Sequence, residues 1–75
     1  MNNGLFLSVP GLCQISYFKG VPRYVLDALV TWVDGDSSLG DCEIGYNEFE
    51  DTFTGTFTGG QTVLFDHEVG VWYES

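Results

Sequence analysis

The chain has 75 residues, of which 44% are hydrophobic and 16% aromatic, and eleven acidic residues against two basic ones give it a net charge of -9. This length allows a single domain, residues 1–75, and the apolar content is too high for an intrinsically disordered chain. The strong negative charge disfavours direct binding to nucleic acid phosphates and to anionic membrane surfaces.

The N-terminal part predicts two strands followed by a helix. Leu5 to Val9 and Leu12 to Phe18 are apolar runs of strand length, and a Pro-Gly turn signal separates them. Pro22 suits the first turn of a helix, and apolar residues then recur at helical spacing until a glycine follows. We therefore expect a helix from about Pro22 to Asp34. The many β-forming residues in this stretch leave a strand as the competing interpretation.

The middle of the chain predicts a loop and a short helix. Asp34 to Gly45 has the composition of a loop. Tyr46, Phe49 and Phe53 then follow at i, i+3 and i+7, the spacing of one face of a helix. This spacing predicts a short amphipathic helix from Tyr46 to Thr52, with acidic residues near its outer side.

The C-terminal part predicts three strands. Thr52 to Thr58 alternates phenylalanine or glycine with threonine, as a half-buried strand does. Gly59-Gly60 is a hairpin signal, Gln61 to Phe65 is the returning strand, and Val69 to Tyr73 is the last strand. The expected fold is α+β, a small antiparallel sheet of about five strands with one main helix packed on one face. The predicted core residues are Val25, Leu29, Trp32, Phe53, Phe57, Phe65 and Trp72.

Acidic residues are concentrated in the middle of the chain, and no basic residue interrupts them. They are Asp34, Asp36, Asp41, Glu43, Glu48, Glu50 and Asp51. One interpretation is a solvated face that keeps a small protein soluble. The other is a charged surface presented to a basic groove, because duplex DNA carries one negative charge per roughly 1.7 Å of its axis and spaced carboxylates can imitate part of that array.

Metal and catalytic sites have weaker support in the sequence. His67 has acidic neighbours on both sides, but neighbours in a strand point to opposite faces, so a solvated turn histidine is expected rather than a metal ligand. Asp34, Asp36 and Asp41 lack the glycine and the final glutamate of an EF-hand loop, which leaves at most a weak divalent site. We expect no cofactor and no enzymatic activity.

The two cysteines, Cys13 and Cys42, allow either a disulfide or two buried free thiols. No basic region precedes the short apolar run at the N-terminus, so a secretory signal is not expected and the reducing cytoplasm favours free thiols. Cys42 lies between Asp41 and Glu43, whose negative charges raise the pKa of a thiol. This argues against Cys42 as a nucleophile, alone or paired with His67.

Two segments resemble the antirestriction family of DNA mimics carried by phages and conjugative elements. Thr31-Trp32-Val33-Asp34 resembles a Trp-aliphatic-Asp motif found early in such proteins. The segment from Phe49 to Phe57 resembles their acidic-aromatic stretch around a glycine. The resemblance implies a non-catalytic inhibitor that occupies the DNA site of a restriction enzyme or a related enzyme.

The sequence thus predicts a small acidic inhibitor, encoded by a phage or mobile element, that blocks a basic nucleic-acid-binding protein of the host by DNA mimicry. Restriction enzymes and CRISPR effector complexes are natural targets because both display basic channels. The alternative is a structural or interaction module, such as a small virion component or complex subunit without an inhibitory role. A homodimer is compatible with either prediction, and binding to a membrane is expected with neither.

Overall fold

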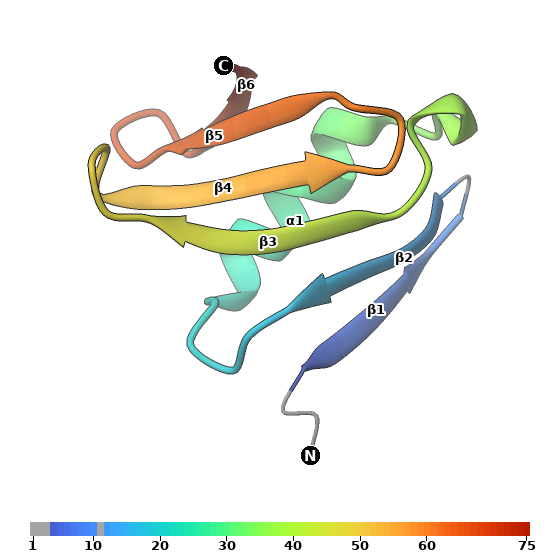
Figure 1. Ribbon diagram of the computed structural model, residues 1–75, viewed down its shortest axis with the longest axis horizontal. Helices are drawn as coiled ribbons and strands as arrows, with labels where there is room; N and C mark the ends of the chain where they lie inside the picture. Colours follow the sequence, from blue (N-terminus) through green and yellow to red (C-terminus); the bar gives the residue numbers. More distant parts are fainter. Residues whose placement is uncertain (1–3, 11) are drawn as a thin grey trace.

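The computed structural model describes residues 4–10 and 12–75, which form one six-stranded sheet with a helix behind it (Figure 1). In chain order the elements are β1 (Leu5–Val9), β2 (Leu12–Tyr17), α1 (Arg23–Val33), the 3₁₀ turn η1 (Ser37–Leu39), β3 (Cys42–Asn47), β4 (Thr52–Phe57), β5 (Thr62–Asp66) and β6 (Val71–Glu74). The expected α+β class is confirmed, with six strands in place of about five.

The strands lie in the sheet in the order in which they occur in the chain, and one pair of neighbours is parallel. This pair is β2 and β3, whose register joins Ile15 to Cys42 and Ser16 to Glu43. The other four pairs are antiparallel. The exception arises because α1 crosses behind the sheet between β2 and β3, and a crossover brings the chain back in the same direction. The sheet is thus mostly antiparallel, as predicted, with one parallel pair.

The short helix predicted from Tyr46 to Thr52 was wrong, and the loop predicted from Asp34 to Gly45 was wrong from Cys42 onward. Cys42 to Asn47 form the central strand β3, and residues 48–51 form the turn of a β-hairpin with β4. In this hairpin Tyr46 lies opposite Phe53, and their rings meet edge to face with centroids 5.8 Å apart. The aromatic spacing that suggested one face of a helix instead reflects a contact between side chains on two neighbouring strands.

Helix α1 follows the prediction to within a residue at each end. Pro22 precedes it in an extended conformation, and Asp34 ends it in the left-handed conformation with a φ of 51°. Its buried residues are Val25, Leu26, Leu29 and Val33, at the spacing that puts them on one stripe. This stripe packs against one face of the sheet (Figure 1), so the competing strand interpretation of the segment was wrong.

The core lies between α1 and the sheet face that α1 covers. Of the seven predicted core residues, six are buried; they are Val25, Leu29, Phe53, Phe57, Phe65 and Trp72. Trp32 is only partly buried and stacks on Phe57 with ring centroids 5.8 Å apart. The indole Nε1 of Trp72 donates a hydrogen bond to the carbonyl oxygen of Val25 at 3.0 Å, which joins the last strand directly to the helix.

Along β4, Gly55 lies on the buried side and Gly45, in the neighbouring strand, on the exposed side. A Cβ atom at Gly55 would lie 2.9 Å from Cγ2 of Val63 and 3.3 Å from Sγ of Cys42. A Cβ atom at Gly45 would meet nothing within 4 Å. Gly55 is therefore needed for close packing of the core, whereas the fold itself does not need a glycine at position 45. Within the described residues, no helix is long and apolar enough to cross a membrane.

We predict opposite effects of alanine at these two glycines. Gly55→Ala should lower the free energy of unfolding by about 1–3 kcal/mol, because the methyl group overfills the core. Gly45→Ala should leave it unchanged or raise it by up to about 1 kcal/mol, because it removes only the conformational freedom of a glycine. Urea denaturation of both variants measures the difference, and equal losses of stability would contradict this packing.

Candidate functional site

The seven acidic residues singled out in the sequence are all exposed, but the fold divides them. Asp34, Asp36 and Asp41 precede β3 at one end of the sheet, on the right in Figure 1. Glu48, Glu50 and Asp51 occupy the β3–β4 turn at the opposite end, on the left. Glu43 points outward from β3 itself. The two groups are separated by the length of a six-residue strand, roughly 20 Å at about 3.3 Å per residue, so they do not form one continuous array.

At the first end, two of the aspartates hold the backbone in place. Oδ1 of Asp36 accepts hydrogen bonds from the amide of Ser38 at 3.0 Å and from its hydroxyl at 2.6 Å, which caps η1. These hydrogen bonds favour the ionised form and lower the pKa of Asp36. Oδ1 of Asp41 accepts from the amide of Gln14 in β2 at 3.1 Å. Part of the acidic stretch is thus required by the fold.

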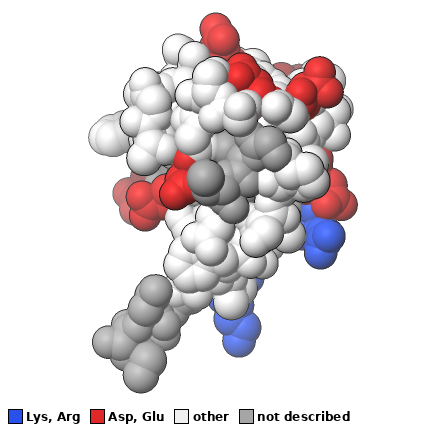
Figure 2. Space-filling view, turned by 90° about the vertical axis from the view of Figure 1, so that its right-hand side faces the viewer, with Lys and Arg blue, Asp and Glu red and all other residues white. Residues whose placement is uncertain are grey.

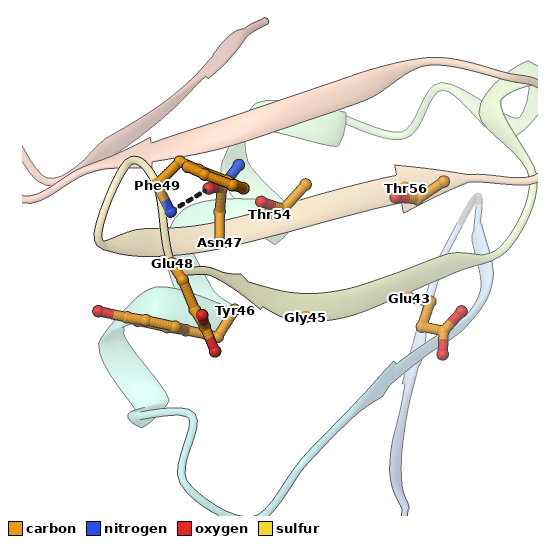
Figure 3. Close-up of a pocket in the computed structure, with 8 residues that line it drawn as sticks. All are labelled: Glu43, Gly45, Tyr46, Asn47, Glu48, Phe49, Thr54 and Thr56. Atoms are coloured by element: carbon orange, nitrogen blue, oxygen red, sulfur yellow. Dashed lines mark hydrogen bonds between the residues drawn. The ribbon is translucent and has the colours of Figure 1, made fainter.

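At the opposite end, Asn47 organises the β3–β4 turn. Its Oδ1 accepts from the amides of Phe49 at 2.9 Å and Glu50 at 3.0 Å. Asp51 adopts a positive φ of 55°, and its carboxylate accepts a hydrogen bond from the hydroxyl of Tyr46. That bond keeps the phenol protonated and raises the pKa of Tyr46. The turn thereby holds the carboxylate of Glu48 in solvent beside Tyr46 (Figure 3).

The β5–β6 turn lies beside the β3–β4 turn and adds to its charge. Oδ1 of Asp66 accepts from the amide of Glu68 at 2.9 Å. The ring of His67 lies 6.0 Å from that of Phe53 and 5.1 Å from that of Phe65, which places this turn against the start of β4. Asp66 and Glu68 therefore lie at the same end of the sheet as Glu48, Glu50 and Asp51, although they were not among the seven acidic residues singled out in the sequence. The order of the predicted strands could have indicated this, because alternate turns of antiparallel strands lie at the same end of a sheet.

Little positive charge balances these carboxylates. Among the described residues there is one ion pair, between Arg23 and Asp27 on α1, with Nε and Oδ1 3.0 Å apart and both side chains exposed. This is the pair at i, i+4 that the helix spacing allows. Figure 2 shows acidic side chains at several separate places on one side of the molecule, and the two basic side chains in its lower part.

The sheet face opposite α1 is uncovered and almost neutral. Its central strands present Gly45, Thr54 and Thr56, with Glu43 at one end of this row and Phe49 at the other (Figure 3). These residues line a shallow depression of about 550 Å³, together with Tyr46, Asn47 and Glu48. The side chain of Phe49 is fully exposed. An exposed aromatic ring beside a depression with carboxylates at its rim suits a cationic group better than an anionic one.

Cys42 and His67, the residues considered for catalysis and metal binding, lie at opposite ends of the sheet. His67 lies in the exposed β5–β6 turn, as expected. Cys42 begins β3 at the far end of the sheet, so Cys42 and His67 do not form a pair. In the described part of the chain, no three histidine, cysteine or acidic side chains come together in a way that could hold a metal ion.

Cys42 carries a free, buried thiol, whereas the side chain of Cys13 lies outside the described residues. Burial raises the pKa of the Cys42 thiol to about 12, and the charge of Glu43 adds a smaller increase. The expected direction is confirmed, but its main cause is burial rather than the acidic neighbours. Since the thiolate is the nucleophile, Cys42 is poorly suited to catalysis.

Comparisons with protein-family models, curated proteins and solved structures give no match for this chain. The resemblance to antirestriction proteins therefore stays a prediction.

We predict that Cys42 does not react with thiol reagents at pH 8 while the protein is folded. A Cys13→Ser variant isolates its signal, and the same variant in concentrated urea should react completely. The free energy of unfolding should also fall as the pH rises above 9.0, where the unfolded thiol ionises and the folded one does not. Fast labelling of the folded variant would show an accessible thiolate and contradict the buried site.

Proposed function

We propose that this protein is a non-catalytic, cytoplasmic inhibitor that occupies the basic nucleic-acid-binding site of a host defence enzyme, such as a restriction enzyme or a CRISPR effector complex. The proposal includes an origin in a phage or mobile element. Its partner is a basic protein, and it involves no cofactor, membrane or direct binding of nucleic acid.

One observation supports this proposal most strongly: most aspartate carboxylates make hydrogen bonds or an ion pair within the fold, whereas the glutamate carboxylates do not. Five of the six aspartate carboxylates accept a hydrogen bond, which for one of them is part of an ion pair; they are Asp27, Asp36, Asp41, Asp51 and Asp66. Within residues 4–10 and 12–75, no hydrogen bond or ion pair is made by the carboxylates of Glu43, Glu48, Glu50, Glu68 and Glu74. All five are exposed.

These free carboxylates raise the self-repulsion of a compact domain without adding a contact that stabilises it. A net charge of magnitude about 2–8 is enough to keep a small domain soluble, and the net charge of -9 lies just above that range. The retained excess is therefore better explained by a positively charged partner, towards which it would also steer association.

The charge density is also on the scale of a nucleic acid. The longest dimension of the molecule is 31 Å. A duplex of that length would carry about 18 negative charges at one per roughly 1.7 Å, twice the net charge of -9 found here. With carboxylates at both ends of the sheet, the molecule offers about half of that charge over the same distance. This supports competition for a surface that binds a phosphate backbone.

The uncovered sheet face favours the second candidate, an interaction module in a virion or protein complex. Phe49 is fully exposed at the edge of that face, and Val71 and Tyr73 in β6 are also exposed. Exposed apolar residues of this kind are common at protein–protein interfaces. The two candidates differ in the partner and in the response to salt.

A pull-down from host-cell lysate, with and without nuclease treatment, distinguishes the two candidates. The proposed function predicts recovery of a nucleic-acid-binding enzyme in both samples, with binding that weakens steeply from about 50 to 200 mM salt. Recovery of capsid or tail proteins through salt-resistant contacts would replace it with the interaction module.

A variant with all five glutamates changed to glutamine tests whether the free carboxylates bind the partner. We predict that it keeps or gains stability, because repulsion falls and no contact is lost, and that it no longer captures the enzyme. The control replaces Asp27, Asp36 and Asp66 by asparagine; it should lose stability by comparison but retain more binding. Normal capture by the five-glutamine variant would assign the glutamates to solubility alone.

A further inference from the structure

Glu43 lies near the start of the central strand β3, on the uncovered sheet face, and borders two hollows. One is the depression over β3 and β4 described above, which extends from Glu43 past Gly45 to Phe49. The other, of about 340 Å³, lies over β2 and β3, and its lining includes Phe6 and Phe18. Both phenylalanines are exposed. The Glu43 carboxylate therefore borders two hollows, each of which has an exposed phenylalanine in its lining.

The surroundings of Glu43 leave its charge unbalanced. Its neighbours in register are Ser16 in β2 and Thr56 in β4, both neutral. The described residues include no cation paired with it, because the one ion pair lies on α1. A carboxylate in this position can accept two parallel N–H hydrogen bonds from a guanidinium, and aromatic faces attract the same group.

Gly45 makes the floor of the depression flat. The fold does not require a glycine here, because a side chain would point into open space. A glycine inside a strand often marks a bulge, a sharp bend or a place where a ligand or another backbone approaches closely, and the β3–β4 register is regular at Gly45. Its absence of a side chain is explained if a partner's main chain crosses the sheet at this point.

The length of the depression fits an extended segment. Glu43 and Asn47 are four residues apart along β3, and Oδ1 of Asn47 accepts a hydrogen bond from the amide of Phe49. The two ends of the depression are therefore about 13 Å apart, at roughly 3.3 Å per residue. Side chains four residues apart in an extended peptide span the same distance and point to the same side. One side chain would reach Glu43 while the other reaches Phe49 and Glu48.

We propose that this face seats an extended, arginine-bearing segment of the basic partner. One guanidinium pairs with Glu43, a second lies against the ring of Phe49 near Glu48, and the segment's main chain crosses over Gly45. This inference rests on the proposed function, since it names the surface through which the inhibitor holds its target, and it makes the sheet face rather than the two acidic ends the main contact.

The test uses a short threonine-rich peptide with two arginines four residues apart, titrated into isotopically labelled protein and followed by NMR. We expect amide shifts concentrated at Gly45, Thr54 and Thr56. Gly45→Val should weaken binding at least tenfold while the protein stays folded, because the new side chain fills the floor. Glu43→Gln and Phe49→Ala should each weaken it about threefold to fivefold.

Two controls make the result specific. Thr62→Val, on the same face but outside the depression, should bind the peptide as the wild type does, and a lysine peptide of the same spacing should bind more weakly. Undiminished binding by Gly45→Val, or shifts confined to the turns, would overturn the inference. Equal binding of the lysine peptide would overturn the assignment to guanidinium.

The pull-down separates this inference from the proposed function. If the wild type captures a nucleic-acid-binding enzyme and Gly45→Val captures it equally well, only the sheet-face contact is wrong. If the wild type captures no such enzyme, the proposed function fails and this inference fails with it.

Discussion

The eleven-residue helix α1 packs against one face of the six-stranded sheet, and this single interface holds nearly all of the core. Trp72 fixes the contact at one edge, since its indole nitrogen donates to the carbonyl of Val25 in the first turn of the helix. Gly55 lets Val63 and Cys42 close over the middle of the sheet. Because one helix covers one face, the other face must tolerate water, and the threonines and Gly45 of the central strands meet that requirement.

The different roles of aspartate and glutamate follow from the many turns that a six-stranded sheet requires. Six strands need many turns, and the short side chain of aspartate can accept hydrogen bonds from nearby backbone amides, as Asp36 and Asp66 do. Glutamate is one methylene longer and serves these turns less well. The glutamates of this chain instead carry charge into solvent, and the proposed partner is the counterpart of that charge.

Local patterns were sufficient to predict the elements that are determined locally. The span of β1 was predicted correctly, as was α1 to within a residue, and the Gly59-Gly60 hairpin signal does separate β4 from β5. β3 was missed because its two buried residues, Cys42 and Ile44, alternate with Glu43 and Gly45, which have low strand propensity. The aromatic spacing from Tyr46 to Phe53 then favoured a helix, although the residues meet across a hairpin.

The arrangement of the site depended on information that short windows do not contain. The seven acidic residues were correctly expected at the surface, but their division between two ends follows from β3 being a strand. The parallel pairing of β2 and β3, which places Glu43 beside Ser16, depends on the crossover of α1. Asp66 and Glu68 lie at the same end as the β3–β4 turn only because of the order of the strands in the sheet.

Competition between this protein and DNA for one site on the target can be measured directly. Labelled duplex DNA is bound to the captured enzyme, the unlabelled protein is added, and fluorescence anisotropy reports how much DNA stays bound. We expect complete displacement of the DNA at low salt when the protein is added in near-stoichiometric amount. Simultaneous binding of protein and DNA in one complex would show that the acidic surface does not occupy the nucleic acid site.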